Sequence, residues 1–210
     1  PQEYQKVNDY VTGQIDSRVA WFLKDRYHAG KSATFFLTEL GQPLIRETSK
    51  DRAFYQFYPN LEAHTRVVEG RLPQAIIAAP GTQPEIEVAI DAKTAAIFEV
   101  TVGDRLVTIP YWDDINPQAT TLITGIIEPT SPNEEYWLIE HKSFLSQSAS
   151  FRFAPLFVPQ QTFLEGVGAL FPRMTSTYAW LLAVEQDTIS ADVVSRAKFG
   201  IDSMEDEIGS

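Results

Sequence analysis

The sequence contains no cysteine, only three histidines and two methionines, and no long apolar run. Without cysteine the chain can form no disulfide, thiolate metal site, iron–sulfur cluster or cysteine nucleophile. The longest apolar stretches, Ala75 to Pro80 and Tyr178 to Val184, fall well short of the roughly 20 residues that a membrane-spanning helix needs. Basic residues number 17 against 28 acidic ones, and the resulting net charge of −11 excludes a nucleic-acid binder that relies on a positive field.

What the sequence does contain is typical of a folded domain. Apolar residues make up 44% and charged residues 21% of the 210 positions, and a chain of this length can bury roughly 70% of its unfolded surface. The first residues, Pro-Gln-Glu-Tyr, include neither an initiator methionine nor the basic and apolar regions of a secretion signal. We therefore expect the chain to be an excised part of a longer protein.

The N-terminal part predicts a helix followed by strands. From Gln2 to Ser17 apolar residues recur at a spacing of four, which indicates an amphipathic helix. Residues 18–27 and 33–40 are rich in aromatic and β-branched side chains, and Gly30 between them can adopt positive φ. We expect a β-hairpin here, with its turn at His28 to Lys31.

The middle of the chain reads as short strands with turns between them. The expected strands are Phe54 to Tyr58, Ala75 to Ala79, Ile86 to Ile90, Leu106 to Pro110, Thr121 to Ile127 and Phe151 to Val158. Between two of them, Asp91 to Val100 suits a short helix with Asp91 as its N-cap. The proline-rich stretch Pro129 to Pro155 predicts an excursion from the sheet.

The C-terminal part repeats the pattern of the beginning. A strand is expected at Tyr178 to Gln186, and a helix after Ser190 as N-cap. The simplest packing joins the two chain ends, residues 1–60 and 160–210, as one α/β subdomain. Residues 61–159 then form an inserted β-rich subdomain, and the fold class is α+β.

Motifs for catalysis are missing from the sequence. His28 to Ser32 ends like a phosphate-binding loop, but Asp25 stands where that loop needs glycine. The histidines are isolated, and the acidic pairs Asp113-Asp114 and Glu134-Glu135 lack the ligand spacing of a calcium loop. We expect no catalytic residue, cofactor or metal ion, with a hydrolase that uses two converging carboxylates as a remaining alternative.

Aromatic residues offer a possible contact surface. Trp112, Trp137 and Tyr136 neighbour polar turns and are the candidates for an exposed partner contact. A secreted carbohydrate-binding or adhesion module is the alternative function that such a surface supports. It requires Trp112 and Trp137 to lie exposed and side by side.

Several short blocks between Thr65 and Pro159 carry a resemblance through their order and spacing. The blocks are Val67 to Pro73, Glu87 to Ile90, Asp91 to Ala95, Val102 to Ile109, Thr121 to Glu128 and Leu156 to Pro159. Together they resemble the extracytoplasmic core domain of MacB/FtsX-type ABC transporter permeases, with its Glu-Gly-Arg-x-Pro and Val-Gly-Asp sequences.

The residues that define these blocks also predict local shape. Gly70 lets the chain turn out of a helix end into Arg71, and Pro73 prevents the helix from continuing. Gly103 and Asp104 predict a left-handed turn in which the aspartate bonds neighbouring amides. The last of these residues, Gly125, lies in an apolar strand and indicates a bulge or a close backbone approach.

The resemblance implies a mechanical role. A membrane-anchored domain on the extracytoplasmic face of a bacterial cell membrane would transmit ATP-driven motion of transmembrane helices, in export or in envelope signalling. Its partners would be an ATP-binding cassette subunit, reached through helices outside this sequence, a second permease domain, and an envelope protein or an exported lipid or peptide. It would not itself be an enzyme, and its ends, Pro1 and Ser210, would lie close together on one face.

Overall fold

The fold was obtained as a computed structural model, which describes residues 2–15, 20–46, 49–77, 84–112, 118–140 and 150–185, together with 194, 198 and 199. The chain divides into two compact units. The smaller unit combines the two ends, Pro1–His28 and Trp180–Ser210, and the larger unit is Ala29–Ala179. None of the helices within the described ranges is long and apolar enough to span a bilayer.

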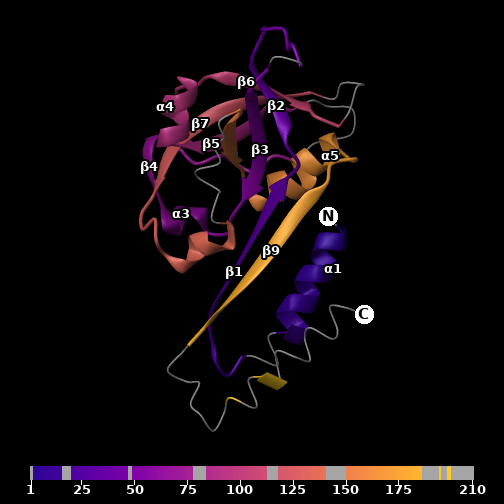
Figure 1. The fold of residues 1–210 in the computed structure, drawn as a ribbon, viewed down its shortest axis with the longest axis vertical. Coiled ribbons are helices and arrows are strands. Elements are labelled where there is room, and N and C mark those ends of the chain that lie inside the picture. Colours follow the sequence, from indigo (N-terminus) through magenta and orange to yellow (C-terminus); the bar gives the residue numbers. More distant parts are fainter. Residues whose placement is uncertain are drawn as a thin grey trace. The chain divides into compact units, whose positions relative to one another are not determined.

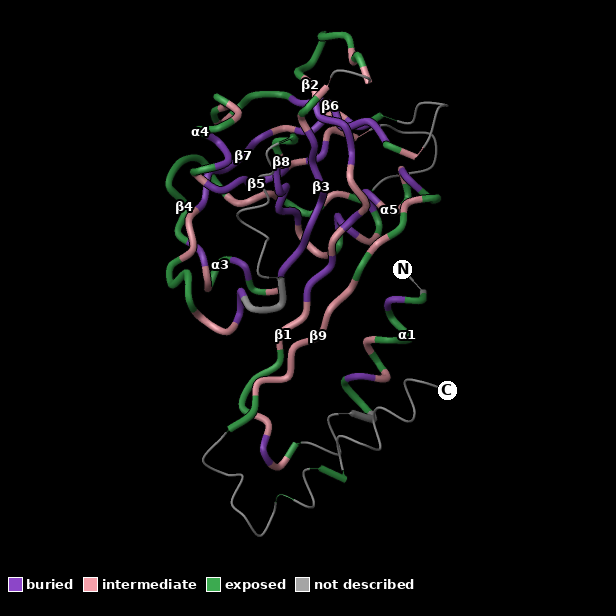
Figure 2. Tube along the Cα trace, in the orientation of Figure 1, coloured by how far each residue is buried: buried purple, intermediate pink, exposed green. Residues whose placement is uncertain are grey.

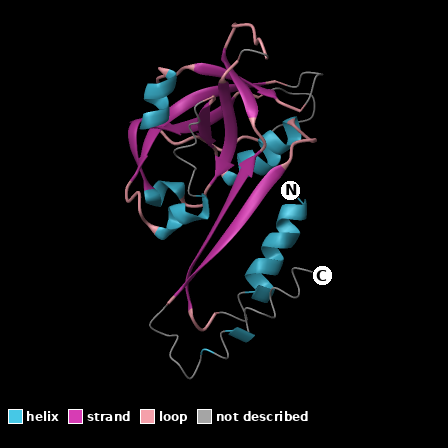
Figure 3. Ribbon diagram, in the orientation of Figure 1, coloured by secondary structure: helices cyan, strands magenta, loops and turns pink. Residues whose placement is uncertain are grey.

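Strands dominate the structure (Figure 3). They are β1 (Leu23–Ser32), β2 (Phe35–Glu39), β3 (Asp51–Phe57), β4 (Thr65–Gly70), β5 (Ile86–Asp91), β6 (Arg105–Pro110), β7 (Ala119–Pro129), β8 (Arg152–Phe157) and β9 (Ser176–Val184). The helices are α1 (Gln2–Tyr10), α3 (Leu61–His64), α4 (Ala92–Phe98) and α5 (Gly168–Leu170), with the 3₁₀ helix η2 (Glu135–Glu140) and the π-helical segments η1 (Val11–Ile15) and η3 (Thr162–Val167). The fold is therefore a mixed α+β fold with a sheet-rich body.

Strand pairing in the larger unit closes into a ring (Figure 1). β2 pairs with β6 on one side and with β3 on the other. The remaining members of the ring follow in the order β6-β7-β5-β8-β3, with parallel pairs at β5–β7 and β3–β8. Outside the ring, β4 pairs with β7, and β1 pairs with β3 and continues the sheet to β9. Closure leaves the ring strands with no open edge of their own.

The core of the larger unit is aromatic and includes a buried hydroxyl network. Figure 2 shows β3 buried along most of its length. The Tyr55 hydroxyl lies 2.7 Å from Thr108 Oγ1 and 3.0 Å from Thr121 Oγ1, and its ring meets Phe35 edge-on at 5.4 Å. Burial raises the pKa of Tyr55 to about 12, with the two threonine hydrogen bonds opposing that rise. This network ties three strands of the ring together from inside.

The described part of the smaller unit is held by a few aromatic contacts. Val11 and Phe22 are buried, and half-buried aromatic and leucine side chains pack against them. Trp180 stacks on Tyr4 with ring centroids 6.0 Å apart, and its Nε1 donates a hydrogen bond to Asn8 Oδ1 at 3.3 Å. A helix is confirmed for α1 and η1, within residues 2–15, but Val7 of the predicted apolar face is 45% exposed and only Val11 of that face is seen buried in this described range.

Most of the predicted strands are confirmed. β3, β5, β6, β7, β8 and β9 occupy the expected stretches to within a few residues. The predicted helix cap is confirmed too, because Asp91 Oδ1 accepts hydrogen bonds from the backbone N–H groups of Lys93 at 3.0 Å and Thr94 at 3.2 Å. The apolar runs of these strands and the capping aspartate are local features, so the sequence was enough to predict them.

The predicted hairpin at His28 to Lys31 is wrong. β1 runs straight through these residues and pairs with β3, where Gly30 lies opposite Phe57. A Cβ at Gly30 would lie 2.3 Å from the Phe57 ring. Glycine is therefore required here for close packing against an aromatic ring, and not for a turn.

The expected strand at Ala75 to Ala79 does not form over residues 75–77, which lie in an irregular segment. The Ile76 N–H donates to Thr162 Oγ1 at 2.8 Å instead of to a neighbouring strand. Gly70 also differs from expectation, because it ends strand β4 and not a helix.

Three further predictions concern positions or boundaries. The helix after Ser190 lies almost wholly outside the described residues, as do Pro1 and Ser210. Both predicted subdomain boundaries, at 60/61 and 159/160, fall inside the larger unit. The division into residues 1–60 with 160–210 and residues 61–159 stays a prediction.

Candidate functional site

One edge of β7 is hydrogen-bonded by two segments in turn. The first is β6 with the turn before it, and the second is β4 with the residue after it. β6 pairs with Ala119 to Leu122 and β4 with Gly125 to Pro129. Between them, Gly103 N donates to Ile123 O at 2.8 Å, Ile123 N donates to Asp104 O at 3.0 Å, and Arg71 N donates to Thr124 O at 2.8 Å. We call this place the β7 junction and define it as Gly70, Arg71, Gly103, Asp104 and residues 123–125.

Two glycines of the β7 junction allow backbones to touch. A Cβ at Gly125 would lie 2.2 Å from the Arg71 carbonyl oxygen, and a Cβ at Gly70 would lie 2.2 Å from the Thr124 carbonyl oxygen. Gly70 also has φ of +73°. The β5–β7 register shifts between Val88 and Ala89, opposite Gly125. The predicted bulge or close approach at Gly125 is thus confirmed.

Gly103 and Asp104 form the turn that precedes β6. Gly103 has φ of +99°, and no atom lies within 4 Å of the place where its Cβ would be. Asp104 Oδ2 accepts a hydrogen bond from the Thr101 N–H at 2.7 Å. Both features agree with the predicted left-handed turn and its aspartate bond.

An ion pair fixes the segment that leaves the junction. Arg71 Nη1 and Nη2 donate to the two carboxylate oxygens of Glu87 on β5, each at 2.6 Å. Glu87 Oε2 also accepts a hydrogen bond from the Gln74 N–H at 2.9 Å. The Glu87 carboxylate therefore holds the chain both before and after half-buried Pro73. The bonds from Arg71 hold the pKa of Glu87 below its usual value, aided by the Gln74 amide and opposed by partial burial.

The structure therefore brings together five of the six motif residues chosen from the sequence, with Pro73 next to them. Glu87 and Thr124 complete the arrangement and were missed as site residues. The Arg71–Glu87 pair joins residues 16 positions apart, and no local pattern marks such a pairing. The junction positions backbone segments, and the carboxylates of Glu87 and Asp104 are engaged by an arginine or by backbone amides.

The aromatic candidates for a partner contact are placed differently from expectation. Tyr136 and Trp137 are 3% and 6% exposed. The Tyr136 hydroxyl donates to Pro59 O at 2.9 Å, and His64 stacks on its ring with centroids 3.6 Å apart. Burial is the main reason that the pKa of Tyr136 is raised. Neither residue offers the exposed face that a partner contact requires.

Trp112 does not join these two residues. Its ring is half-buried and meets Phe35 edge-on at 5.0 Å. Trp137 instead packs against Tyr58, with ring centroids 5.4 Å apart. The exposed side-by-side pair of Trp112 and Trp137, on which a carbohydrate-binding surface depended, is absent from the described part of the chain.

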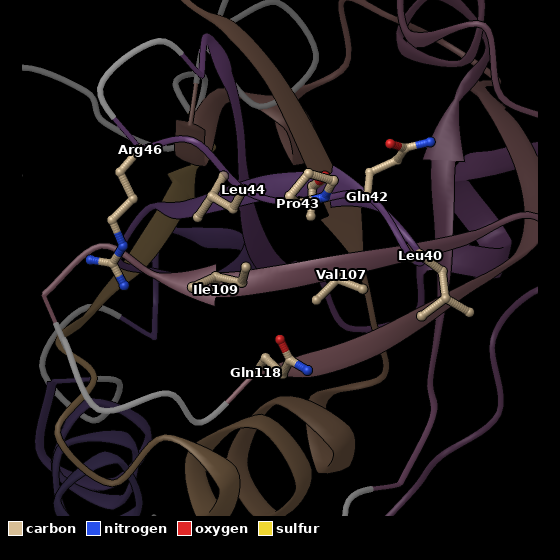
Figure 4. Close-up of a pocket in the computed structure, with 10 residues that line it drawn as sticks. Leu40, Gln42, Pro43, Leu44, Arg46, Val107, Ile109 and Gln118 are labelled. Carbon is tan, nitrogen blue, oxygen red and sulfur yellow. The ribbon is translucent and has the colours of Figure 1, made fainter.

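A hollow of about 620 Å³ opens beside β6 (Figure 4). Its apolar side is formed by Val107 and Ile109 of β6 and by Leu44, while Gln118 and Arg46 lie at its margins. The volume is in the range of small-molecule sites. The hollow therefore has an apolar floor, with amide and guanidinium groups beside it.

Among the described residues, no group of three or more histidine, aspartate and glutamate side chains is arranged to hold a metal ion. Several acidic side chains have structural partners instead. Besides Glu87 and Asp91, Glu85 pairs with Arg105 and Asp51 pairs with Arg152, each at 2.6 Å. Each of these carboxylates thus braces neighbouring elements.

No family model and no curated protein matches the chain. Among solved structures, it is similar to the crystal structure of "a domain of a putative Permease protein from Porphyromonas gingivalis". The TM-score is 0.39 and the sequences are 11% identical, over 87% of this chain and 70% of that chain.

Proposed function

We propose that this chain is the extracytoplasmic domain of a MacB/FtsX-type ABC transporter permease. In this role it passes ATP-driven motion of transmembrane helices to a substrate or partner outside the bacterial membrane. The ATP-binding cassette and a second permease domain act as its partners within the transporter, and the exported molecule is a lipid or peptide.

The β7 junction is the observation that carries this proposal. The Glu-Gly-Arg-x-Pro and Val-Gly-Asp sequences and the block Thr121 to Glu128 are far apart along the chain, yet Arg71, Gly103 and Thr124 meet within one hydrogen-bonded joint. Short sequence blocks that matched a family by chance would have no reason to complement one another in space. Their assembly in space supports a resemblance in fold, beyond a similarity of separate short sequences.

The architecture also suits transmission of force. Coupling between distant places requires packed elements that move as bodies. The ring of β2, β6, β7, β5, β8 and β3 is closed, filled with aromatic side chains and braced by the Tyr55 hydroxyl network. Such a body can convey displacement without itself being deformed.

The location of the domain is testable with single cysteines, because the sequence has none of its own. Leu40 is 54% exposed and Phe54 is 2% exposed. In intact cells that make the parent permease, we expect a membrane-impermeant maleimide to label Leu40→Cys. Phe54→Cys is the matched control and should stay unlabelled. Labelling of Leu40→Cys only after permeabilisation would place the domain inside the cell and overturn the proposal.

The mechanical role is testable with a staple across β4 and β7. Val67 lies opposite Ile127 in the strand register, so Val67→Cys with Ile127→Cys can form a cross-strand disulfide. If the domain moves as one body, the transporter should keep its ATP-dependent export activity when this disulfide forms. Export activity that stops on oxidation and returns on reduction would show that the domain works by deforming, contrary to the proposal.

A further inference from the structure

A buried glutamine in the larger unit lacks a partner for its amide group. Gln56 on β3 is 1% exposed, between the buried residues Phe54 and Tyr58 on the same face of the strand. Its Nε2 has no hydrogen-bond acceptor among the described residues. A buried amide without a partner is unfavourable, since it has lost its hydrogen bonds to water.

Gln56 lines a small cavity together with residues of β1 and β9. The lining consists of Gln56, Tyr58, Ala29, Gly30, Lys31, Thr177 and Ala179. All of these residues belong to the larger unit. The volume is about 10 Å³, close to what one water molecule needs and too small for an organic ligand.

The charged side chain of the lining cannot satisfy the amide. Lys31 stands opposite Gln56 in the strand register, and its ammonium group lies 4.2 Å from the centroid of the Phe54 ring. An ammonium group only donates hydrogen bonds, so it cannot accept one from Nε2. The remaining polar side chains of the lining are those of Tyr58 and exposed Thr177, and both carry a hydroxyl group.

We propose that this cavity is a binding site for a single ordered water molecule, held by the Gln56 amide. Water both donates and accepts, so it satisfies the amide in either orientation of its nitrogen and oxygen. The small side chains of Ala29 and Ala179 leave the space that the water fills. The site hydrates the sheet where β1 lies between β3 and β9.

The first test is nuclear magnetic resonance of the whole ¹⁵N-labelled chain. We expect the Gln56 side-chain NH₂ protons to show a cross-peak to water with the NOE sign of a molecule held longer than surface hydration. The exposed amide of Gln42 is the internal control and should show only the short-lived kind. A Gln56 amide without a water cross-peak, or with short-lived hydration only, would overturn the site.

The second test removes the space for water with and without the amide. Ala179→Val is made in the natural chain and in the Gln56→Met variant, whose new side chain has a similar volume but no amide. If the valine expels a water that the amide needs, the melting temperature should fall by about 2–4 °C more in the natural chain than in the Gln56→Met background. An equal fall in both backgrounds would show only steric crowding and would overturn the proposal.

Discussion

The two units of the chain are stabilised by different kinds of contact. In the larger unit a closed ring of strands surrounds fully buried side chains such as Tyr55, Phe35 and Phe57. In the described part of the smaller unit, Val11 and Phe22 are buried and half-buried rings such as Trp180 pack around them. Because buried apolar area is the main source of stability, we expect the larger unit to unfold as one body and the smaller unit to open first.

This difference also explains where shape-defining residues occur. The glycines in close contact belong to the larger unit, where Gly70 and Gly125 face backbone carbonyls and Gly30 faces the Phe57 ring. By contrast, among the described residues no atom outside its own helix backbone lies within 4 Å of the place where a Cβ at Gly13 in the smaller unit would be. A glycine is thus indispensable where non-local strands meet and replaceable where the chain packs loosely.

Gly125→Ala should have the largest effect of the substitutions considered. The added methyl group would meet the Arg71 carbonyl, which two strands hold in place, and we expect a loss of about 3 kcal/mol of unfolding free energy. Urea unfolding followed by circular dichroism measures the loss. Gly13→Ala is the matched control and should change stability by less than about 0.5 kcal/mol. Equal effects of the two would remove the contrast between the units.

Tyr55→Phe tests the hydroxyl network inside the ring. It leaves the Thr108 and Thr121 hydroxyls without their shared partner, and we expect a cost of about 1–2 kcal/mol. Tyr111→Phe, whose residue is 61% exposed, is the control and should be nearly neutral.

The same residue makes a prediction about alkaline pH. The pKa of Tyr55 is raised to about 12 in the folded chain, against about 10 when unfolded. Because the unfolded chain releases this proton first, the contribution of Tyr55 is complete below about pH 10 and is lost as the pH rises toward 12. Urea unfolding between pH 9 and 12 should show a shallower decline for Tyr55→Phe than for the natural chain, and parallel declines would contradict the prediction.

Trp180→Ala should act on the smaller unit alone. It removes the stack on Tyr4 and the hydrogen bond to Asn8, at a cost of about 1 kcal/mol because the ring is only half-buried. Amide hydrogen exchange should accelerate in α1, while β3 and β7 keep their protection. Faster exchange throughout both units would mean that they do not open separately.

Sequence patterns were sufficient wherever the signal was local. Apolar β-branched runs indicated β5, β6 and β7, and Asp91 marked its helix because a cap acts on the next few residues. The turn at Gly103 and Asp104 was equally visible. These features together define much of the sheet, but they do not reveal which strand pairs with which.

The errors came from contacts between distant residues. The local sequence predicts a turn at Gly30 because the actual neighbour of this residue, the Phe57 ring, belongs to another strand. Tyr136 was expected to be exposed because its flanks are polar, yet Pro59 and His64 cover it. Ring closure through β2 likewise depends on pairings with both β6 and β3 that no single window of sequence contains.

The smallest expected effect concerns Glu87, whose ion pair with half-exposed Arg71 is screened by water. Its pKa is lowered in the folded chain, so the stabilisation is present above the ordinary carboxylate value of about 4.3 and is lost as the pH falls through the folded pKa. Glu87→Gln should therefore be less stable than the natural chain at pH 7, and the difference should shrink toward pH 3. Urea unfolding over this range measures both, with Glu69→Gln as a control that removes one exposed carboxylate of β4. A difference that is independent of pH would mean that Glu87 acts by packing, and that the β7 junction is held by its backbone contacts alone.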